Sequence, residues 1–270
     1  MPESNSEDDA SAFEIAAIAV DLDGTLLVGD ELPDANRGAL QRAREKGLKV
    51  FIATARWRQM ADRINDLVGG DDGLIACNGA QVRVGEVDHV DLRLPDDLTR
   101  DLFGIANTHR SVVTATFSES SVIKMDGKLS GPLEVPELAQ VDELIPGNDQ
   151  PRIVTIQGSV AVAAAGELKV KYGEVANFAD SIGPSGRVVY TVTHHLAHKG
   201  EALHVLCAAA GVRPEQTLVF GDAENDIAMF RAAGMSVAMG QAQASVRAAA
   251  DHVAPPNDQD GVAVMLARLI

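Results

Sequence analysis

Short apolar runs alternate with helical stripes along the first part of this chain. Residues 15–20 form a continuous apolar run, which is typical of a parallel strand buried on both faces. Residues 32–47 then place apolar side chains at helical spacing and end in a glycine, so they predict a helix. Residues 48–54 and 73–79 predict two further strands, with an amphipathic helix at 58–70 between them. Together these elements predict a βαβαβ unit.

The same alternation returns near the end of the chain. Helix and strand patterns follow one another at residues 200–211, 216–222, 225–234 and 236–240. Two distant stretches that both alternate strand and helix are expected to build one sheet. We therefore expect an α/β fold with a doubly wound, Rossmann-like parallel sheet.

Between these stretches the pattern changes to looser strands, separate helices and a segment rich in glycine, proline and acidic residues. The change predicts an inserted α+β cap domain at residues 84–191, with the doubly wound core formed by residues 13–83 and 192–270. Residues 1–12 are acidic and polar, the opposite of a secretory signal, and we expect a disordered tail there.

The charge balance narrows the choice of partners. With 23 Lys+Arg against 39 Asp+Glu, the formal net charge is -16, which would repel a nucleic acid before local contacts form. No stretch of about 18 uninterrupted apolar residues occurs, so we expect no membrane span. A small anionic substrate fits this charge only if its site holds a cation of its own, such as a metal ion. Cys77 and Cys207 lie in apolar surroundings, which indicates buried thiols in a reducing, cytoplasmic setting.

Two carboxylates separated by one residue, Asp21 and Asp23, end the first predicted strand. Open α/β sheets place their ligand crevice at the carboxyl ends of the strands, and an extended chain would send both side chains to the same side. Asp222 ends another apolar strand and would reach the same crevice. Each acidic segment alone also fits a solvated turn or the acidic first turn of a helix.

Several short motifs occur in an order and spacing that resemble one family. They are DLDGTLL at residues 21–27, TAR at 54–56, NGA at 78–80, HKGEAL at 198–203, GDAENDIAMF at 221–230, and SVAMGQA followed by DGVAVML. In these motifs the chain resembles the haloacid dehalogenase-like phosphohydrolases, and in detail the Cof-type branch with a large α/β cap. The resemblance implies a phosphatase that acts on small phosphorylated metabolites, with sugar phosphates as the first candidates.

The same resemblance implies roles for the acidic residues. Asp21 would be the nucleophile that forms an aspartyl-phosphate, and Asp23 would be the general acid and then the general base. The implied cofactor is Mg²⁺, held by the Asp21 carboxylate, the Asp23 backbone carbonyl and the Asp222 carboxylate. Asp226 would either hold a ligating water molecule or orient Lys199.

Phosphate also needs hydrogen-bond donors and a positive charge. Thr54 can offer its hydroxyl, and the backbone amides of Leu22 and Ala55 lie where turns expose them to an anion. Lys199 supplies a compact cation for the transferring phosphoryl group, and Asn225 supplies an amide. A lysine is usually a solvated surface residue, but one that opens a helix is better explained by a local anion.

The chain departs from the family pattern in a few places. Ala55 stands where the second motif usually has glycine, which keeps the amide but restricts its dihedral angles, and Gln241 replaces a common asparagine. His194 and His198 are four residues apart, as in some zinc sites, with His195 between them. Because this segment joins a strand to a helix and no further ligands are evident, we expect a hinge or entrance loop rather than a metal site.

The cap is expected to cover the crevice and select the leaving group. His89, Lys124, Arg152 and Lys169 are candidates for a substrate contact, although each also fits a solvated surface position. Asn78, at the end of the third strand beside the cap, is a stronger candidate.

Two other functions fit the same residues. A phosphomutase would return the phosphoryl group to another hydroxyl of the sugar, and a silent relative would bind a metabolite without turnover. For the assembly we expect a monomer or a small homo-oligomer.

Overall fold

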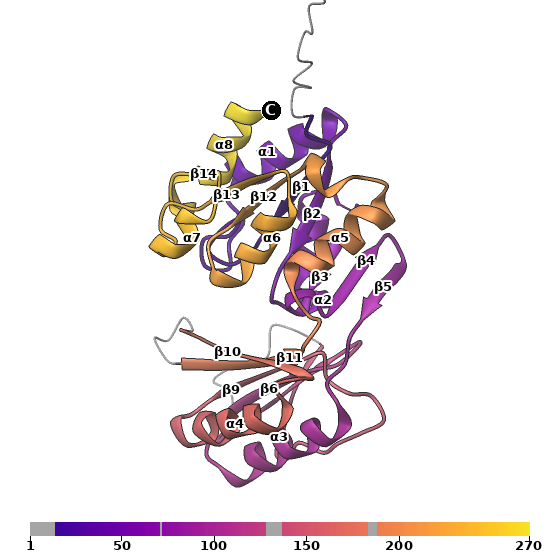
Figure 1. The fold of residues 1–270 in the computed structure, drawn as a ribbon, viewed down its shortest axis with the longest axis vertical. Coiled ribbons are helices and arrows are strands. Elements are labelled where there is room, and N and C mark those ends of the chain that lie inside the picture. The colour runs from indigo at the N-terminus through magenta and orange to yellow at the C-terminus, as the bar shows by residue number, and fades with distance from the viewer. Residues whose placement is uncertain (1–13, 71, 128–136, 183–187) are drawn as a thin grey trace, which may run out of the picture.

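The computed structural model describes residues 14–70, 72–127, 137–182 and 188–270. The expected tail at residues 1–12 lies outside these ranges. The chain forms two lobes, each built on its own sheet, and the chain crosses between them twice (Figure 1).

The larger sheet is doubly wound. In spatial order its strands are β14 (His252–Val253), β13 (Met235–Ala238), β12 (Thr217–Gly221), β1 (Ala17–Val20), β2 (Lys49–Ala53), β3 (Leu74–Ala76), β4 (Gln81–Val84) and β5 (Val87–Asp91). All neighbouring strands from β14 to β3 pair in parallel, and β4 and β5 continue the sheet as an antiparallel hairpin. This sheet draws strands from both ends of the chain, so the predicted doubly wound α/β core is confirmed.

Alternating side chains of the central strands supply two apolar layers. Ile18 and Val20 face one layer, and Ala17 and Ala19 face the other, as the strand period of two requires. The first layer packs against α1 (Asp34–Glu45), α2 (Arg58–Leu67) and α8 (Gly261–Leu269). The second packs against α5 (Lys199–Ala210), α6 (Ile227–Ala232) and α7 (Ala244–Ala248). Because both faces are covered, these strands are almost wholly apolar.

The carboxyl edge of this sheet collects the residues that follow its parallel strands. Asp21 follows β1, Thr54 follows β2, Cys77 follows β3 and Asp222 follows β12. These four strands are adjacent in the order β12, β1, β2, β3, so the side chains after them converge on one region.

The smaller lobe is an α+β cap inserted into the core. Its sheet has the order β10 (Ala176–Ile182), β11 (Val188–His194), β9 (Ile153–Gln157), β6 (Val112–Thr116), β7 (Ser121–Lys124) and β8 (Leu138–Val141). The helices α3 (Asp96–Thr108) and α4 (Ser159–Tyr172) pack on one face of this sheet and form an apolar core with it. In Figure 1 these helices lie on the side of the sheet turned away from the larger lobe.

Strand pairing places both crossings a few residues later along the chain than the expected bounds of the insert, 84–191. β5 belongs to the larger sheet, where Val84 pairs with Val87 across a two-residue turn containing Gly85 at φ 55°. The loose strand pattern at residues 89–94 predicts this strand but places it in the cap, because an exposed edge strand does not show which sheet it joins. At the other end β11 continues to His194 within the cap sheet.

A buried arginine holds the junction between the two lobes. Arg152 is fully buried and donates two hydrogen bonds to Asp91, both 2.7 Å long, and one to Asp149 at 2.5 Å. Removing a partner from such a buried pair leaves an uncompensated charge, so this contact fixes the first crossing.

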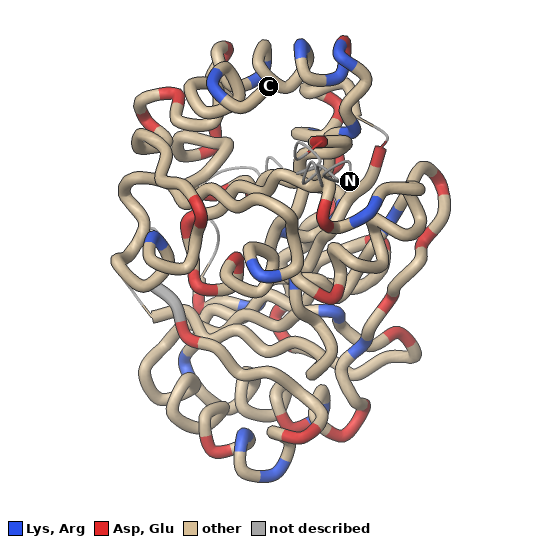
Figure 2. Tube along the Cα trace, turned by 45° about the horizontal axis from the view of Figure 1, so that its top comes forward, with Lys and Arg blue, Asp and Glu red and all other residues tan. Residues whose placement is uncertain are grey.

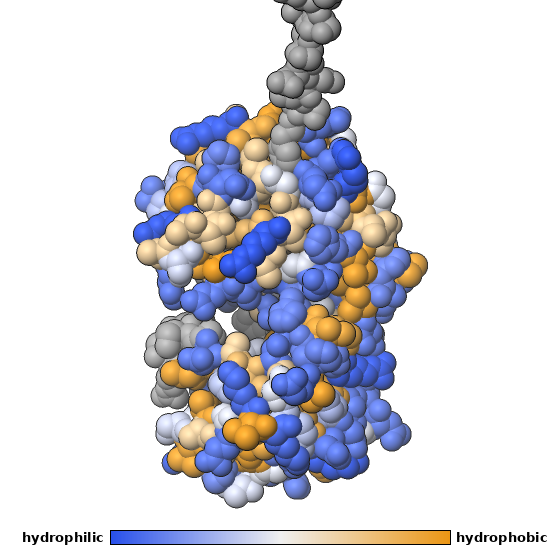
Figure 3. Space-filling view, viewed as in Figure 1, coloured by the Kyte–Doolittle hydropathy of each residue, from blue (hydrophilic) through white to orange (hydrophobic). Residues whose placement is uncertain are grey.

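Further contacts tie the core to the cap at the start of α2. Arg58 pairs with Glu119 at 2.6 Å, and Gln59 donates to the Ser118 carbonyl at 3.2 Å. Figure 3 shows a hollow between the lobes with hydrophilic residues around it on this face.

Charged residues are spread over both lobes rather than gathered in one basic surface, as Figure 2 shows. Within the described part of the chain, no helix is long and apolar enough to cross a membrane.

Candidate active site

Asp21 and Asp222 face each other across the carboxyl edge of the larger sheet. One carboxylate oxygen from each, together with one from Asp226, lies within 4.8 Å of the others. Thr25 donates its hydroxyl to the Asp222 carboxylate at 3.1 Å. Gly24 has φ 77°, and a Cβ there would lie 2.4 Å from an Asp222 oxygen, so glycine is required for this approach.

Lys199 is the cation of the site. Its side chain is 1% exposed, and its ammonium lies 2.6 Å from Asp21 Oδ1 and 2.7 Å from Asp226 Oδ1. The other Asp226 oxygen accepts the backbone amides of Asp222 and Ala223, each at 3.0 Å. Both oxygens of Asp226 are therefore engaged, which favours the predicted role of orienting Lys199 over that of a metal ligand.

Burial and mutual repulsion shape the protonation of these groups. Burial raises the pKa of Asp21 well above its ordinary value, and the charges of Asp226 and Asp222 add to this while Lys199 opposes it. Burial, followed by the charge of Asp226, raises the pKa of Asp222 to about 6. For Lys199 burial lowers the pKa, but Asp21 and Asp226 outweigh burial and raise it. Lys199 alone therefore does not neutralise the site, and a further cation would lower the free energy of the ionised carboxylates.

The donor set fits Mg²⁺. Asp21 and Asp222 offer hard carboxylate oxygens from adjacent strands, and Mg²⁺ prefers a few carboxylates together with water. Three carboxylates lie within 4.8 Å of one another and Lys199 pairs with only two of them, so the cluster keeps negative charge that a cation could offset. When bound, Mg²⁺ would offset the charge of the carboxylates and of a phosphate oxygen.

Asp23 lies apart from the other carboxylates. The chain turns after Asp21, so the buried Leu22 side chain enters the core while the Asp23 side chain is 55% exposed. Its carboxylate accepts Arg56 Nε at 3.1 and 2.9 Å and Nη2 at 2.6 Å. The strand ends at Val20, so the extended conformation that would send both aspartate side chains to the same side does not continue to Asp23.

Arg56 is a residue that the sequence analysis missed as a site residue. Arg56 is the last residue of the TAR motif, and this motif was the signal in the sequence that could have identified it. A motif does not show, however, which carboxylate the arginine side chain contacts.

Two backbone amides at the crevice lack acceptors. Among the described residues, no oxygen accepts the N–H of Leu22 or of Ala55. The Thr54 hydroxyl accepts the Arg56 amide at 3.0 Å and keeps its own proton for another acceptor. These three groups can therefore donate to a phosphate at the crevice.

Asn78 and Asn225 meet across the site. Asn225 Nδ2 donates to Asn78 Oδ1 at 2.9 Å, which brings together two side chains that are 147 residues apart. Asn78 and Cys77 both have positive φ, at 59° and 50°, in a short turn where Gly79 approaches the His198 backbone. Asparagine tolerates a positive φ better than most residues, so the conformation of this turn by itself favours an asparagine at position 78.

Gln241 holds the loop that carries the aspartates. It donates to the Gly24 carbonyl at 2.5 Å and accepts the Asn257 amide at 3.1 Å. The glutamine that replaces the common asparagine thus holds the backbone of the loop next to Asp23 in place.

The histidines lie at the second crossing between the lobes. The rings of His194 and His195 stand 4.4 Å apart, and the Leu196 amide donates to His194 Nδ1 at 3.2 Å. Burial, with a smaller contribution from His195, lowers the pKa of His194. Among the described residues, the group of metal-ligating side chains close enough to share an ion is Asp21, Asp222 and Asp226.

Three of the four cap candidates do not face the crevice. Arg152 is buried at the junction, as described above. Lys124 is 8% exposed and pairs in the sheet with Val113, whose side chain lies in the apolar core under the helices. Lys169 is exposed on α4, on the far side of the cap sheet. His89 lies on the edge strand β5, where it is exposed.

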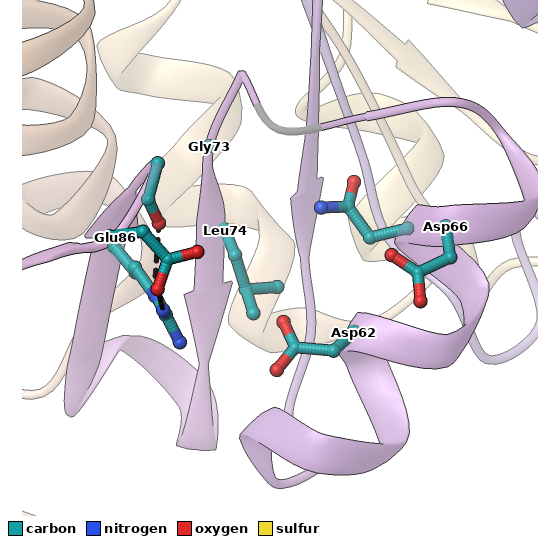
Figure 4. A pocket seen from close by; sticks show the side chains of 8 residues that line it. Asp62, Asp66, Gly73, Leu74 and Glu86 are labelled. Atoms are coloured by element: carbon teal, nitrogen blue, oxygen red, sulfur yellow. Dashed lines mark hydrogen bonds and ion pairs between the residues drawn. The ribbon is translucent and has the colours of Figure 1, made fainter.

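A separate acidic pocket of about 280 Å³ lies between α2 and the hairpin formed by β4 and β5. Figure 4 shows Asp62 and Asp66 on one side of it and Glu86 on the other, with Leu74 between them. Glu86 is paired with Arg83 at 2.6 Å. No strand end at the carboxyl edge contributes to this pocket, so it is distinct from the site of Asp21.

A doubly wound sheet with an acidic crevice at its carboxyl edge and an inserted cap defines the class of this protein as an α/β protein with a capped crevice. The family profile of haloacid dehalogenase-like hydrolases matches residues 18–266. The chain therefore belongs to the haloacid dehalogenase-like hydrolases.

Related proteins agree with this assignment. The 5-amino-6-(5-phospho-D-ribitylamino)uracil phosphatase YcsE of Bacillus subtilis is 30% identical over 252 residues, covering 93% of this chain and 94% of that protein. A phosphoglycolate phosphatase of Archaeoglobus fulgidus is 28% identical and covers 93% and 95% of the two chains. The chloroplastic endoribonuclease YBEY of Arabidopsis thaliana is 28% identical over 91% of this chain, which spans 45% of that protein's length.

Solved structures share the whole fold. A subclass IIB sugar phosphatase of the haloacid dehalogenase superfamily has a TM-score of 0.76 and 25% identity, covering 93% of this chain and 98% of that one. A haloacid dehalogenase-like hydrolase from Bacteroides thetaiotaomicron has a TM-score of 0.80 at 23% identity, covering 95% and 100%. Core and cap are both included in these matches.

Proposed function

We propose that this enzyme is a Mg²⁺-dependent phosphomonoester hydrolase for small phosphorylated metabolites, sugar phosphates first. One observation carries the proposal: a buried ammonium, Lys199, bridges Asp21 and Asp226 while Asp222 lies beside them. The names of the full-length relatives, each a phosphatase of a small phosphate ester, support the substrate class.

Asp21 is the nucleophile in this proposal. Its carboxylate oxygen attacks phosphorus in line, and the bond from phosphorus to the alcohol oxygen breaks. Lys199 and the free amides of Leu22 and Ala55 stabilise charge on the phosphoryl oxygens. The protonated Asp23 gives its proton to the leaving alkoxide.

Water completes the reaction in a second step. Ionised Asp23 takes a proton from water as its oxygen attacks the aspartyl-phosphate, and the bond between Asp21 and phosphorus breaks. Free phosphate and the original Asp21 carboxylate result. Transfer to a second hydroxyl of the same sugar would instead make the enzyme a phosphomutase.

Phosphate release across a panel of phosphorylated metabolites, with and without Mg²⁺, tests the proposal. We expect release that requires Mg²⁺ and that the Asp21→Asn variant lacks. Near-wild-type hydrolysis of an aryl phosphate by Asp21→Asn would refute the mechanism. Isomerised sugar phosphate without free phosphate would indicate the phosphomutase, and tight binding without either product would indicate a silent binding protein.

The location is proposed on a separate observation. Both cysteines, Cys77 and Cys207, are free and buried, which supports a reducing compartment such as the cytoplasm.

A further inference from the structure

Arg56 connects three segments at the mouth of the crevice. Its guanidinium donates to both oxygens of Asp23, and Nη2 also donates to Asp30 at 2.9 Å. Asp30 lies at the tip of a two-residue turn, where Val28 and Glu31 pair with each other. One side chain thus holds the aspartate loop and the turn that follows it.

Two hydrogen bonds of the Arg56 backbone fix the position of this residue. Its amide donates to the Thr54 hydroxyl at 3.0 Å, and its carbonyl accepts the Cys77 amide at 2.9 Å. The Arg56 backbone is thus anchored to the ends of two strands, and its side chain extends from there to Asp23. Such an anchor limits the entropy lost in holding the carboxylate.

The burial of the partners is unequal. The Arg56 side chain is 15% exposed, whereas Asp23 is 55% and Asp30 is 89% exposed. An exposed ion pair with a single contact contributes little to the free energy of folding. A guanidinium that makes a forked contact from a nearly buried side chain, in contrast, fixes both the position and the direction of a carboxylate. The contact therefore orients Asp23 more than it stabilises the fold.

We propose that Arg56 is a positioning residue that holds the Asp23 carboxylate in place for its role as the general base of the second step. This inference rests on the proposed function. The forked guanidinium contacts both oxygens of Asp23, so it fixes where the carboxylate lies when water has to give up a proton.

The carboxyl group of Asp23 acts in both steps of the proposed reaction. In the first step it gives a proton to the leaving alkoxide. In the second step it takes a proton from water as the water oxygen bonds to phosphorus and the bond from phosphorus to Asp21 breaks.

Arg56→Met tests this inference through the two steps of the reaction. With 4-nitrophenyl phosphate, kcat/KM reports the steps up to the release of nitrophenol, which needs no general acid, and breakdown of the phosphorylated enzyme affects only kcat. We expect kcat to fall about tenfold or more while kcat/KM stays unchanged, since a well-placed base contributes about 10²–10⁴-fold. KM falls in parallel, and rapid acid quench shows phosphorylated enzyme accumulating after a burst of nitrophenol.

Arg83→Met is the matched control. Arg83 has a 20% exposed side chain and pairs with a 95% exposed glutamate, Glu86, but it lies away from Asp23. We expect this variant to keep both kcat and kcat/KM. Arg56→Lys keeps the charge but not the fork, and its kcat should lie between those of the wild type and Arg56→Met; it also serves as the test if Arg56→Met does not fold.

The outcomes separate the two proposals. If the wild type forms phosphorylated enzyme but the Arg56 variants break it down at the wild-type rate, the role of Arg56 is refuted and the proposed function stands. Equal losses of kcat and kcat/KM without accumulation would also refute it, because they indicate a purely structural role. If Asp21→Asn retains turnover, the proposed function itself fails.

Discussion

Replacing Asp222 with asparagine should stabilise the metal-free protein near neutral pH. Burial and the charge of Asp226 raise the pKa of Asp222 from 3.8 to about 6, so its ionised form is disfavoured in the fold. Asparagine removes this charge and can still accept the Thr25 hydroxyl that now bonds to Asp222 at 3.1 Å. It also has nearly the same shape, so the close approach to Gly24 is kept.

The size of the effect follows from linkage. Each pKa unit corresponds to about 1.4 kcal/mol, so this shift gives an upper bound of about 3 kcal/mol. Solvent screening of a partly exposed carboxylate reduces this to about 1–2 kcal/mol. At about 2–4 °C per kcal/mol for a chain of comparable size, the melting temperature of Asp222→Asn should rise by about 2–8 °C.

The pH dependence has a definite sign. A raised carboxyl pKa means that the folded state keeps its proton longer than the unfolded chain, so the wild type loses stability as pH rises from 3.8 through about 6. The advantage of Asp222→Asn should therefore be full at about pH 7.5, smaller at about pH 5, and largely absent only below pH 3.8.

Thermal unfolding in EDTA and in Mg²⁺ gives the measurement. Mg²⁺ at about 100 times its Kd should stabilise the wild type by about 2.7 kcal/mol, and Asp222→Asn should gain almost nothing. Asp62→Asn, in the separate acidic pocket, is a control that should keep the response to Mg²⁺. A variant no more stable than the wild type at neutral pH in EDTA would refute the electrostatic reasoning, and an undiminished Mg²⁺ response would refute the ligand assignment.

Three further substitutions test other parts of the site. Lys199→Met should abolish phosphatase turnover and lower the free energy of unfolding by about 3–5 kcal/mol, measured by denaturant titration, because it strands buried carboxylates. Gly24→Ala should eliminate the Mg²⁺-induced rise in melting temperature, since its Cβ would meet Asp222 at 2.4 Å. Because the pKa of His194 is lowered, this residue contributes a loss of stability as pH falls below 6.5. The stability of His194→Asn, which keeps an acceptor for the Leu196 amide, should therefore increase relative to the wild type as pH falls from about 7 to about 5, as measured by thermal unfolding.

The core was predictable because its signals are local. Apolar runs and helical stripes identify the strands and helices of the doubly wound sheet, and the residues after each strand converge as the carboxyl edge requires. The strand β5 was predicted as part of the cap rather than of the larger sheet, because an exposed edge strand with charged residues has no burial pattern that shows which sheet it joins.

The side-chain pairings were less predictable, since they depend on distant contacts. The motifs indicated that Asp21, Asp222 and Lys199 belong together, but not that Asp23 turns to Arg56. That turn depends on the strand ending at Val20, a detail of one or two residues that periodicity does not resolve.

Trapping the phosphorylated enzyme tests the central claim most directly. The wild type would be mixed with 4-nitrophenyl phosphate and Mg²⁺, quenched in acid within the first turnovers, digested and analysed by mass spectrometry. The account predicts one added phosphoryl group on the peptide that contains Asp21, and none when Mg²⁺ is withheld. Phosphate release with the phosphoryl group on another residue, or with no phosphorylated peptide at any quench time, would contradict it.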